Sequence, residues 1–475
     1  MAIPSVQPPT RSLLRHPDFM KFWSAETISQ FGTQISLLAL PLIAINVLEA
    51  SPFEVALLGT IEFLPFILFS LPAGAWIDRL RRRPILIAGD LGRAIALGSI
   101  PIAFALDGLT IWQLYVVGFT VGVLTVFFDV SYQAYVPSLV DRDQLIEANS
   151  KLEISRTIAQ TAGTAIAGGI IQLVRAPMAI LIDAISFVVS GIFVLLIRRP
   201  EPTPDRHLDE HGRPRGSMRS EVAAGLRYVL GNRYLRGIAA STGISNLFTN
   251  IGFATLLVFL VRELGLEAGA IGLAFGLGNV GAIVGALTAT RFSRVVGVGP
   301  AIVLSVAIGA PSLFLVALAP VDTAFPFLVA AGMLTGFSAV GYNVNQVSFR
   351  QAITPERMQG RMHATMRFIV WGTIPVGQIL GGFIAQALTD AGLGLRPVIL
   401  LGGIGAASAI LPVLLTPVRT IREMPTGPED VGEPVGPTGP TGPLDGPRET
   451  EPPEPIPTPL GPTEPVELES DGPDD

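Results

Sequence analysis

The chain of 475 residues has no cysteine and only four histidines, and lysine is nearly absent beside abundant arginine. The absence of cysteine excludes disulfides, a thiolate nucleophile and a cysteine metal site. The histidines all fall in hydrophilic segments, and their spacing is not typical of metal ligands. Since no nucleophile–base pair is evident either, we expect no metal, no cofactor and no enzymatic activity. The histidines are His16, His207, His211 and His363.

Charge is also scarce, because charged residues make up 15% of the chain and hydrophobic residues 49%. This composition in a chain of such length indicates a polytopic membrane protein. Apolar runs of roughly 20 residues recur along it, each long enough to cross a bilayer core of about 30 Å. They predict an all-α membrane protein with twelve transmembrane helices, at residues 19–47, 54–77, 84–106, 110–132, 154–174, 177–197, 237–261, 268–289, 300–319, 324–348, 366–388 and 397–417.

Basic residues are distributed unevenly among the loops between these runs. If the N-terminus is cytoplasmic, the inner loops receive most of them, including the arginine-rich segment 79–83. The outer loops receive only Arg175, Arg262 and Arg396. Cytoplasmic loops carry an excess of lysine and arginine. The asymmetry therefore predicts an even number of spans with both termini in the cytoplasm.

The longest internal loop separates two halves of six spans. Within it, residues 217–235 have one apolar face, which predicts either an amphipathic helix at the inner membrane surface or a soluble linker helix. No cleavable signal is visible at the start, since residues 1–17 are polar and basic, so the first span is expected to direct insertion. The end of the chain is rich in Pro, Gly and acidic residues and is expected to be disordered. The predicted parts are a cytoplasmic N-terminus (1–18), an N-terminal six-helix bundle (19–197), a cytoplasmic linker (198–236), a C-terminal six-helix bundle (237–423) and a tail (424–475).

The loop between the second and third runs carries a specific motif, Gly74-Ala75-Trp76-Ile77-Asp78-Arg79-Leu80-Arg81-Arg82-Arg83-Pro84. Its pattern resembles the signature loop between helices 2 and 3 of the major facilitator superfamily of transporters. We interpret Gly74 as allowing close helix packing and Asp78 as an acceptor for a helix end or an arginine. A purely topogenic role would explain the arginines but not the spacing of Gly and Asp. The motif thus predicts a conformational latch made of Gly74, Asp78, Arg79 and Arg83.

The two halves also resemble each other, since a constant shift places Gln133 on Gln346 and the pair 168–169 on 381–382. The superfamily resemblance implies two six-helix pseudo-repeats with substrate near the midplane between them. The segments 22–29 and 148–150 are most similar to the branch that includes enterobactin exporters and macrolide efflux pumps. In the fifth span, residues 163–169 resemble the glycine motif of antiporters, except that Thr164 stands where a proline is usual.

Ionisable residues inside the spans are candidates for function, because a charge at the centre of a span costs roughly 2.5 to 3.5 kcal/mol on insertion scales. Glu26, Glu62 and Asp129 are the candidates for proton coupling, although Glu26 could instead be interfacial. Neither glutamate has a basic residue three or four positions away. Asp90 and Arg93 are one helical turn apart and predict a structural ion pair on a peripheral span.

Polar residues in other spans are candidates for a substrate cavity. Glu26, Gln30 and Thr33 share one helical face. The resemblance implies that spans 1, 4, 7 and 10 line the central cavity, so that Glu26 and Asp129 would face amides of the second half. The candidates for contact with substrate are Gln30, Thr33, Asn246, Asn250, Asn343 and Gln346.

The resemblance implies a multi-pass exporter of the bacterial inner membrane, moving amphiphilic small molecules of drug or siderophore type. Alternating access driven by proton antiport would supply the energy, so the proton gradient replaces any cofactor. Its partners would be the small-molecule substrate and the lipid bilayer, with no nucleic acid, and the chain would act as a monomer. The alternatives are an importer or uniporter of the same fold, or a transport-dead membrane scaffold or sensor.

Overall fold

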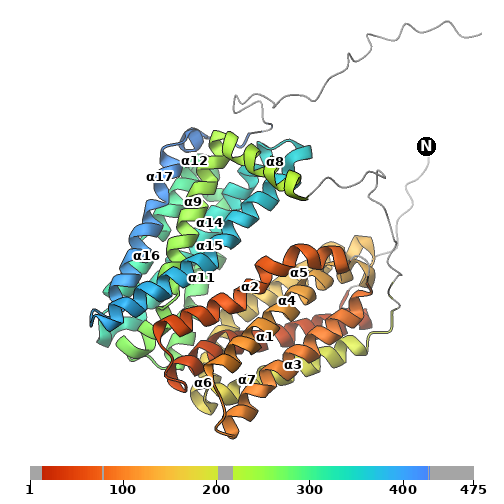
Figure 1. Ribbon diagram of the computed structural model, residues 1–475. Coiled ribbons are helices and arrows are strands. Elements are labelled where there is room, and N and C mark those ends of the chain that lie inside the picture. The colour runs from red at the N-terminus through yellow and green to blue at the C-terminus, as the bar shows by residue number, and fades with distance from the viewer. Residues whose placement is uncertain (1–12, 78–79, 200, 202–217, 426, 428–475) are drawn as a thin grey trace, which may run out of the picture. The chain divides into compact units, whose positions relative to one another are not determined.

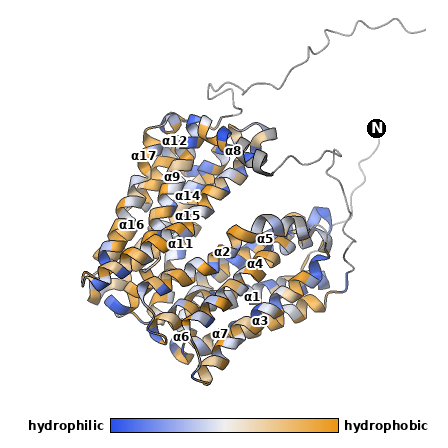
Figure 2. Ribbon diagram, viewed as in Figure 1, coloured by the Kyte–Doolittle hydropathy of each residue, from blue (hydrophilic) through white to orange (hydrophobic). Residues whose placement is uncertain are grey.

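The computed structural model describes residues 13–77, 80–199, 201, 218–425 and 427 (Figure 1). These residues form helices joined by short turns, and twelve helical segments are long and apolar enough to cross a membrane. Figure 2 shows that the segments are largely hydrophobic, with hydrophilic residues mainly toward their ends. The predicted all-α membrane fold with twelve transmembrane helices is confirmed.

The first six spans each contain one helix, except that the fifth combines two. In that span α5 continues into α6 through a π-helical turn at Ala159–Gly163, which frees backbone groups for contacts outside the helix. Short 3₁₀ turns, Leu13–Arg15 and Arg142–Gln144, precede the first and fifth spans. The helices are α1 (Pro17–Asn46), α2 (Pro52–Ile77), α3 (Arg82–Ala105), α4 (Ile111–Leu139), α5 (Leu145–Ile158), α6 (Thr164–Val174) and α7 (Ala176–Leu195).

The last six spans are more often interrupted. Helix α9 is followed by the short α10 and a second π-helical turn, Phe259–Glu263. Pro311 begins a new helix within the ninth span, as expected of a residue without a backbone N–H. The helices are α9 (Arg233–Phe253), α10 (Leu256–Val258), α11 (Ala268–Val296), α12 (Val298–Gly309), α13 (Pro311–Leu318), α14 (Ala324–Ala352), α15 (Glu356–Asp390), α16 (Arg396–Ser408) and α17 (Ile410–Leu414), and 3₁₀ turns lie at Val321–Thr323 and Pro417–Thr420.

The linker contains one helix, α8 (Met218–Gly231). Helix α8 ends at Gly231, and α9 begins directly after Asn232. The Asn232 side chain caps α9, because it accepts hydrogen bonds from the backbone N–H groups of Tyr234 and Leu235. Val229 is fully buried, and Gly225 lies directly against the backbone of Arg361 in α15. The segment expected at 217–235 is thus two helices, and α8 packs on the protein through α15. The tail predicted at 424–475 lies almost entirely outside the described residues.

Small residues bring the two halves into direct contact. A methyl group on Gly272 of α11 would lie 2.7 Å from the Cα atom of Gly168 in α6, so a larger residue at either position would separate these helices. Helices α2 and α15 meet through aromatic rings, with the centroids of Phe53 and Phe383 4.8 Å apart. Arg262 adds hydrogen bonds to backbone carbonyl groups of the first half. These contacts join α6 to α11 and α2 to α15.

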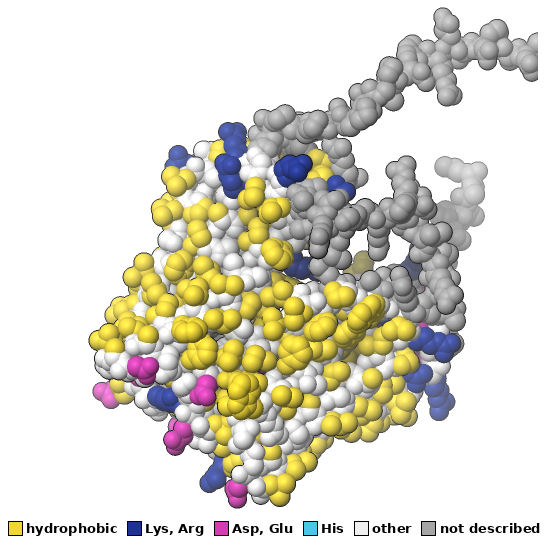
Figure 3. Space-filling model, viewed as in Figure 1, with side chains coloured by type: hydrophobic (Ala, Val, Ile, Leu, Met, Phe, Trp, Pro, Cys, Tyr) yellow, Lys and Arg dark blue, Asp and Glu magenta, His cyan; other side chains and the backbone are white. Residues whose placement is uncertain are grey.

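The exposed side chains fit a membrane environment. Figure 3 shows a broad area of hydrophobic side chains, with most of the visible lysine and arginine beyond one margin and the acidic side chains beyond another. Large apolar residues in the spans are among the most exposed, including Ile95, Trp112, Leu173 and Leu287. Water would not favour such a surface, whereas lipid tails would cover it at no cost.

Candidate functional site

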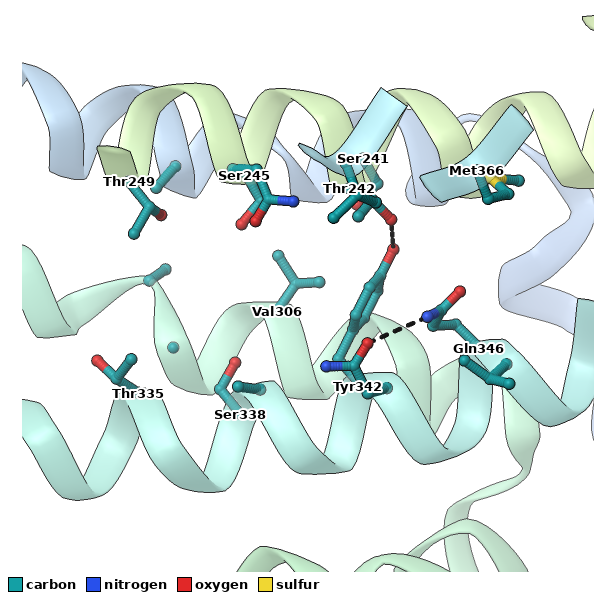
Figure 4. A pocket seen from close by; sticks show the side chains of 18 of the residues that line it. Ser241, Thr242, Ser245, Thr249, Val306, Thr335, Ser338, Tyr342, Gln346 and Met366 are labelled. Atoms are coloured by element: carbon teal, nitrogen blue, oxygen red, sulfur yellow. Dashed lines mark hydrogen bonds between the residues drawn. The ribbon is translucent and has the colours of Figure 1, made fainter. Parts of the chain in front are cut away.

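The main cavity lies within the second half and has a volume of about 440 Å³. Its lining residues come from α9, α12, α13, α14, α15 and α16. Hydroxyl and amide side chains face each other across it, as Figure 4 shows for α9 and α14. These groups can exchange hydrogen bonds with a polar ligand while the surrounding helices keep it away from lipid. They include Ser241, Thr242, Ser245, Asn246, Thr249, Thr335, Ser338, Tyr342, Asn343 and Gln346.

Hydrogen bonds among the lining residues fix their positions. The hydroxyl groups of Tyr342 and Thr242 lie 2.7 Å apart and connect α14 to α9 (Figure 4). Gln346 Nε2 donates to Asn343 Oδ1 at 3.2 Å. The Gln346 side-chain oxygen is buried and has no hydrogen-bond partner among the described residues. The wall is therefore ordered but retains an acceptor for a ligand.

One end of this cavity is basic. Arg350, one helical turn beyond Gln346, lines it and is only 7% exposed. His363 and Arg367 of α15 also line the cavity, and the Arg367 guanidinium carbon lies 5.5 Å from the centre of the Trp371 ring. No aspartate or glutamate is among its lining residues in the described part of the chain. The cavity therefore combines neutral polar groups with positive charge.

A second cavity of about 410 Å³ adjoins the first and is mainly apolar. Phe253, Ser312, Leu313, Thr335 and Ala339 line both cavities, so the two are neighbours. The second also receives four side chains from the first half, namely Gln34, Leu37, Leu38 and Thr164. A ligand with an apolar portion would thus find a hydrophobic surface next to the polar wall.

The first half contains a separate cluster of charged groups around Glu26. Glu26 is buried and accepts a hydrogen bond of 2.8 Å from Gln30 Nε2, while its other carboxylate oxygen has no partner among the described residues. Arg93 and Asp129 lie near enough to act on it electrostatically. Asp129 itself is exposed and also interacts with Arg156. Helices α1, α3, α4 and α5 therefore contribute to one charged cluster.

Arg93 is surrounded by compensating groups. Its Nη2 atom lies 2.7 Å from Asp90 Oδ1, and its guanidinium carbon lies 4.3 Å and 4.2 Å from the ring centres of Phe128 and Phe187. Asp90 also accepts a hydrogen bond from Ser190 at 2.8 Å. The structure thus contains the ion pair that the sequence indicates. The Asp90–Arg93 pair lies in the interior of the first half, between α4 and α7. There the Asp90 carboxylate and the two aromatic rings stabilise the buried guanidinium group.

Glu62 occupies a different environment. Its side chain lies against Gly118 of α4, and one carboxylate oxygen is buried without a hydrogen-bond partner among the described residues. Among the described residues Glu62 forms no salt bridge, and burial is the main influence on its carboxyl group. Glu62 is therefore the most isolated of the candidate carboxylates, whereas Glu26 has a cationic neighbour on another helix.

The loop motif is only partly described, since Asp78 and Arg79 lie outside the described residues. Arg83 donates hydrogen bonds to the carbonyl oxygens of Val194 and Leu195, which end α7. A methyl group added to Gly74 would meet no described atom within 4 Å, so no described helix packs closely against Gly74. This differs from the close packing that we expected of Gly74, and the reason is that α2 has no described neighbour against that position.

The cavity candidates from the sequence separate into two groups. Asn246, Asn343 and Gln346 line the main cavity. Asn250 lies against Gly377 of α15, and its side chain donates to the backbone oxygen of Asn246 at 2.8 Å. The remaining candidates, Gln30 and Thr33, belong to α1 and are not among the residues that line either cavity.

Sequence reasoning missed several lining residues, above all Tyr342, Thr242 and Arg350. A signal for the α14 wall was present, because Thr335, Ser338, Tyr342 and Gln346 repeat at spacings of three and four and so share a helical face. Arg350 continues the same spacing, but an arginine near a span end usually reaches water, so the sequence does not predict that Arg350 is buried.

Comparisons with known proteins agree with this architecture. The chain is 24% identical to macrolide efflux protein A of Streptococcus pyogenes over 386 residues, which cover 78% of this chain and 90% of that protein. It is 26% identical to the multidrug efflux pump Tap of Mycolicibacterium fortuitum over 376 residues, covering 75% and 86%. It is 24% identical to the enterobactin exporter EntS of Salmonella choleraesuis over 410 residues, covering 86% and 89%.

Solved transporter structures share the fold. A point mutant of the nucleoside transporter NupG matches with a TM-score of 0.68 at 13% identity, over 84% of this chain and 99% of that chain. A bacterial homologue of the iron transporter ferroportin in an inward-facing state matches with a TM-score of 0.64 at 16% identity, over 85% and 99%. Residues 22–372 match the sequence profile of the Major Facilitator Superfamily. The chain therefore belongs to the Major Facilitator Superfamily and is a multi-pass membrane transporter with relatives of the efflux type.

Proposed function

We propose that this transporter exports amphiphilic small molecules across a bacterial inner membrane, acting as a monomer with both termini in the cytoplasm. The observation that carries this proposal is the pair of adjoining cavities, one of about 440 Å³ lined by polar groups and one of about 410 Å³ that is mainly apolar. An amphiphile needs both kinds of surface. The names of the macrolide, multidrug and enterobactin relatives support export as the direction.

Energy for export would come from proton antiport. The acidic residues that lie deep in the spans belong to the first half, whereas the two cavities are formed mostly by the second half. Glu26, Glu62 and Asp129 are the proposed coupling residues. Substrate and proton would then occupy different halves and exchange through a change in how the halves contact each other, as in alternating access.

The loop motif is proposed to stabilise one conformation of the transporter. Glu201 accepts hydrogen bonds from the backbone N–H groups of Arg82 and Arg83 at 2.6 Å and 3.1 Å, at the beginning of α3. An acidic group at a helix N-terminus is favourable. The motif is thereby tied both to the linker, through Glu201, and to α7, through Arg83. Gly74, Asp78 and Arg79 complete the proposed latch.

The full chain should be tested in a host that lacks its own drug pumps, with a panel of antibiotics and siderophores. We expect reduced accumulation of at least one amphiphilic compound, and loss of that effect when the proton gradient is collapsed. Uptake in place of efflux would favour an importer or uniporter. If no compound moves in cells and in proteoliposomes with a proton gradient, the proposal is wrong and a scaffold or sensor role becomes the better explanation.

A further inference from the structure

Among the described residues, two arginines in the spans are buried, and their surroundings differ sharply. Arg93 has the Asp90 carboxylate at 2.7 Å and two aromatic rings within 4.3 Å. Arg350 is about as deeply buried, at 7% exposed against 5%. Its Nε atom is buried without a hydrogen-bond partner, and among the described residues it forms no ion pair and no side-chain hydrogen bond. Arg350 is thus a buried charge with no counter-ion in the described part of the chain.

A purely topological role does not account for Arg350. Basic residues that orient a membrane protein lie in water at the cytoplasmic side. Arg361 of α15 is exposed, does not line the cavity and fits that description. Arg350 is only 7% exposed and lines a cavity within the protein. Burying an unpaired charge costs several kcal/mol in general, so a protein keeps such a group where a partner arrives from outside.

The lining of the cavity indicates what that partner is. Among the described residues that line it there are arginines and a histidine but no acidic side chain. The buried Gln346 side-chain oxygen, one turn from Arg350, is also unpartnered there and can accept a hydrogen bond from a hydroxyl group. Arginine presents a planar fork of donors that matches a carboxylate or a phosphate. Trp371, beside Arg367, adds an aromatic surface at the same end.

We propose that the main cavity is a binding site for amphiphiles that carry an anionic group, with Arg350 as the residue that pairs with it. The apolar part of the ligand lies against Phe253 and Leu313, where the cavity continues into its mainly apolar neighbour. This inference rests on the proposed export of amphiphiles and narrows it to anions. A cationic amphiphile would have to enter a site with uncompensated positive charge, which is unfavourable.

The test uses the full chain in lipid nanodiscs and two dyes built on one xanthene scaffold, anionic fluorescein and cationic rhodamine 123. Equilibrium binding is measured by fluorescence anisotropy for the wild type, Arg350→Gln and Arg350→Lys. Arg291→Gln is the matched control, because Arg291 is an exposed arginine of the same half that does not line the cavity. Size-exclusion chromatography establishes that each variant is folded.

We expect the wild type to bind fluorescein at least tenfold more tightly than rhodamine 123. The glutamine variant should lose about tenfold or more in fluorescein affinity, which is what a hydrogen-bonded ion pair contributes. The lysine variant keeps the positive charge but not the planar fork, so it should retain the preference for fluorescein with a reduced affinity, and Arg291→Gln should retain the full affinity. If Arg350 had only a structural role, Arg350→Gln would weaken the binding of both dyes equally. Our inference instead predicts that Arg350→Gln does not weaken the binding of rhodamine 123.

Equal binding of the two dyes by the wild type, or unchanged fluorescein binding in Arg350→Gln, would overturn the inference. If the glutamine variant does not fold, the dye preference of the wild type and its retention in Arg350→Lys decide the question. The same experiments distinguish a failure of this inference from a failure of the proposed function. A protein that exports rhodamine 123 yet does not bind fluorescein is still an exporter, whereas one that binds fluorescein through Arg350 but transports nothing is not.

Discussion

Arg93 of α3 contacts Asp90 at 2.7 Å, one turn earlier on the same helix, and both side chains are buried inside the first half. Ser190 of α7 donates a hydrogen bond to the other Asp90 oxygen, and the rings of Phe128 and Phe187 pack against the Arg93 guanidinium group. This arrangement lets a full positive charge exist at membrane depth. It also places Arg93 close enough to Glu26 and Asp129 to influence them.

The first prediction concerns the stability of this pair. Asp90→Asn should lower the stability of the first half by about 3 to 5 kcal/mol, because it leaves Arg93 buried without a counter-charge. Thermal unfolding in detergent measures the effect. Glu153→Gln is the control, since the Glu153–Arg156 pair is exposed and such pairs contribute about 0 to 1 kcal/mol. Equal melting temperatures for Asp90→Asn and the control would show that the pair is not structural.

The second prediction concerns the contact between the halves. The Cβ atom of Gln172 lies 3.9 Å from the position that a Cβ atom on Gly269 would occupy, which is within the range for a disulfide. The chain has no cysteine, so Gln172→Cys with Gly269→Cys makes a single possible disulfide. Oxidation should join α6 to α11 and stop transport, because alternating access requires the halves to move relative to each other.

Transport by the double variant should return when a reductant is added. Each single cysteine variant should transport in both conditions and serves as the control. A double variant that is shown to be fully oxidised by gel shift, yet transports at the wild-type rate, would mean that this contact does not open during the cycle.

The third prediction concerns the end of the chain. Residues 434–475 are rich in Pro, Gly and acidic residues and lie outside the described residues. Among the described residues, the last hydrogen bonds to the helices come from Arg422, whose backbone oxygen accepts from the N–H of Val298 and whose side chain donates to the Val296 carbonyl. Truncation after Glu433 should therefore leave insertion and transport within about twofold of the full chain, measured at equal expression. Loss of transport in the truncated protein would favour the scaffold or sensor function.

Much of this architecture follows from sequence because membrane spans have a simple physical signature. Apolar length predicts the twelve helices, and helical spacing predicts the Asp90–Arg93 pair. Contacts between helices have no such signature. The sequence alone could not place Arg93 beside Glu26, which lies on another helix, nor show that Asn250 faces α15 while Asn246 faces the cavity. Arg350 is the clearest case, since only the packed structure separates it from arginines that reach water.

The last prediction concerns coupling. A carboxyl group that is buried without a charged partner can carry a proton, and it releases that proton when the conformation exposes it to water. The structure distinguishes the two glutamates, because Arg93 acts on Glu26, whereas Glu62 forms no salt bridge among the described residues and burial is the main influence on its carboxyl group. Glu62→Gln should abolish proton-driven export while leaving substrate binding within about threefold. Glu26→Gln should also abolish coupling if the cluster with Asp129 transfers the proton.

Substrate-induced proton release from protein in proteoliposomes distinguishes these cases. Glu54→Gln is the matched control, because Glu54 lies on α2 as Glu62 does, but its carboxylate is occupied by the backbone N–H of Ser51 at 2.7 Å. The control should release protons as the wild type does, whereas Glu62→Gln should not. If both Glu62→Gln and Glu26→Gln release protons normally, the coupling site is elsewhere. Asp129 is then the residue to change, since it is the remaining candidate carboxylate and the only exposed one of the three.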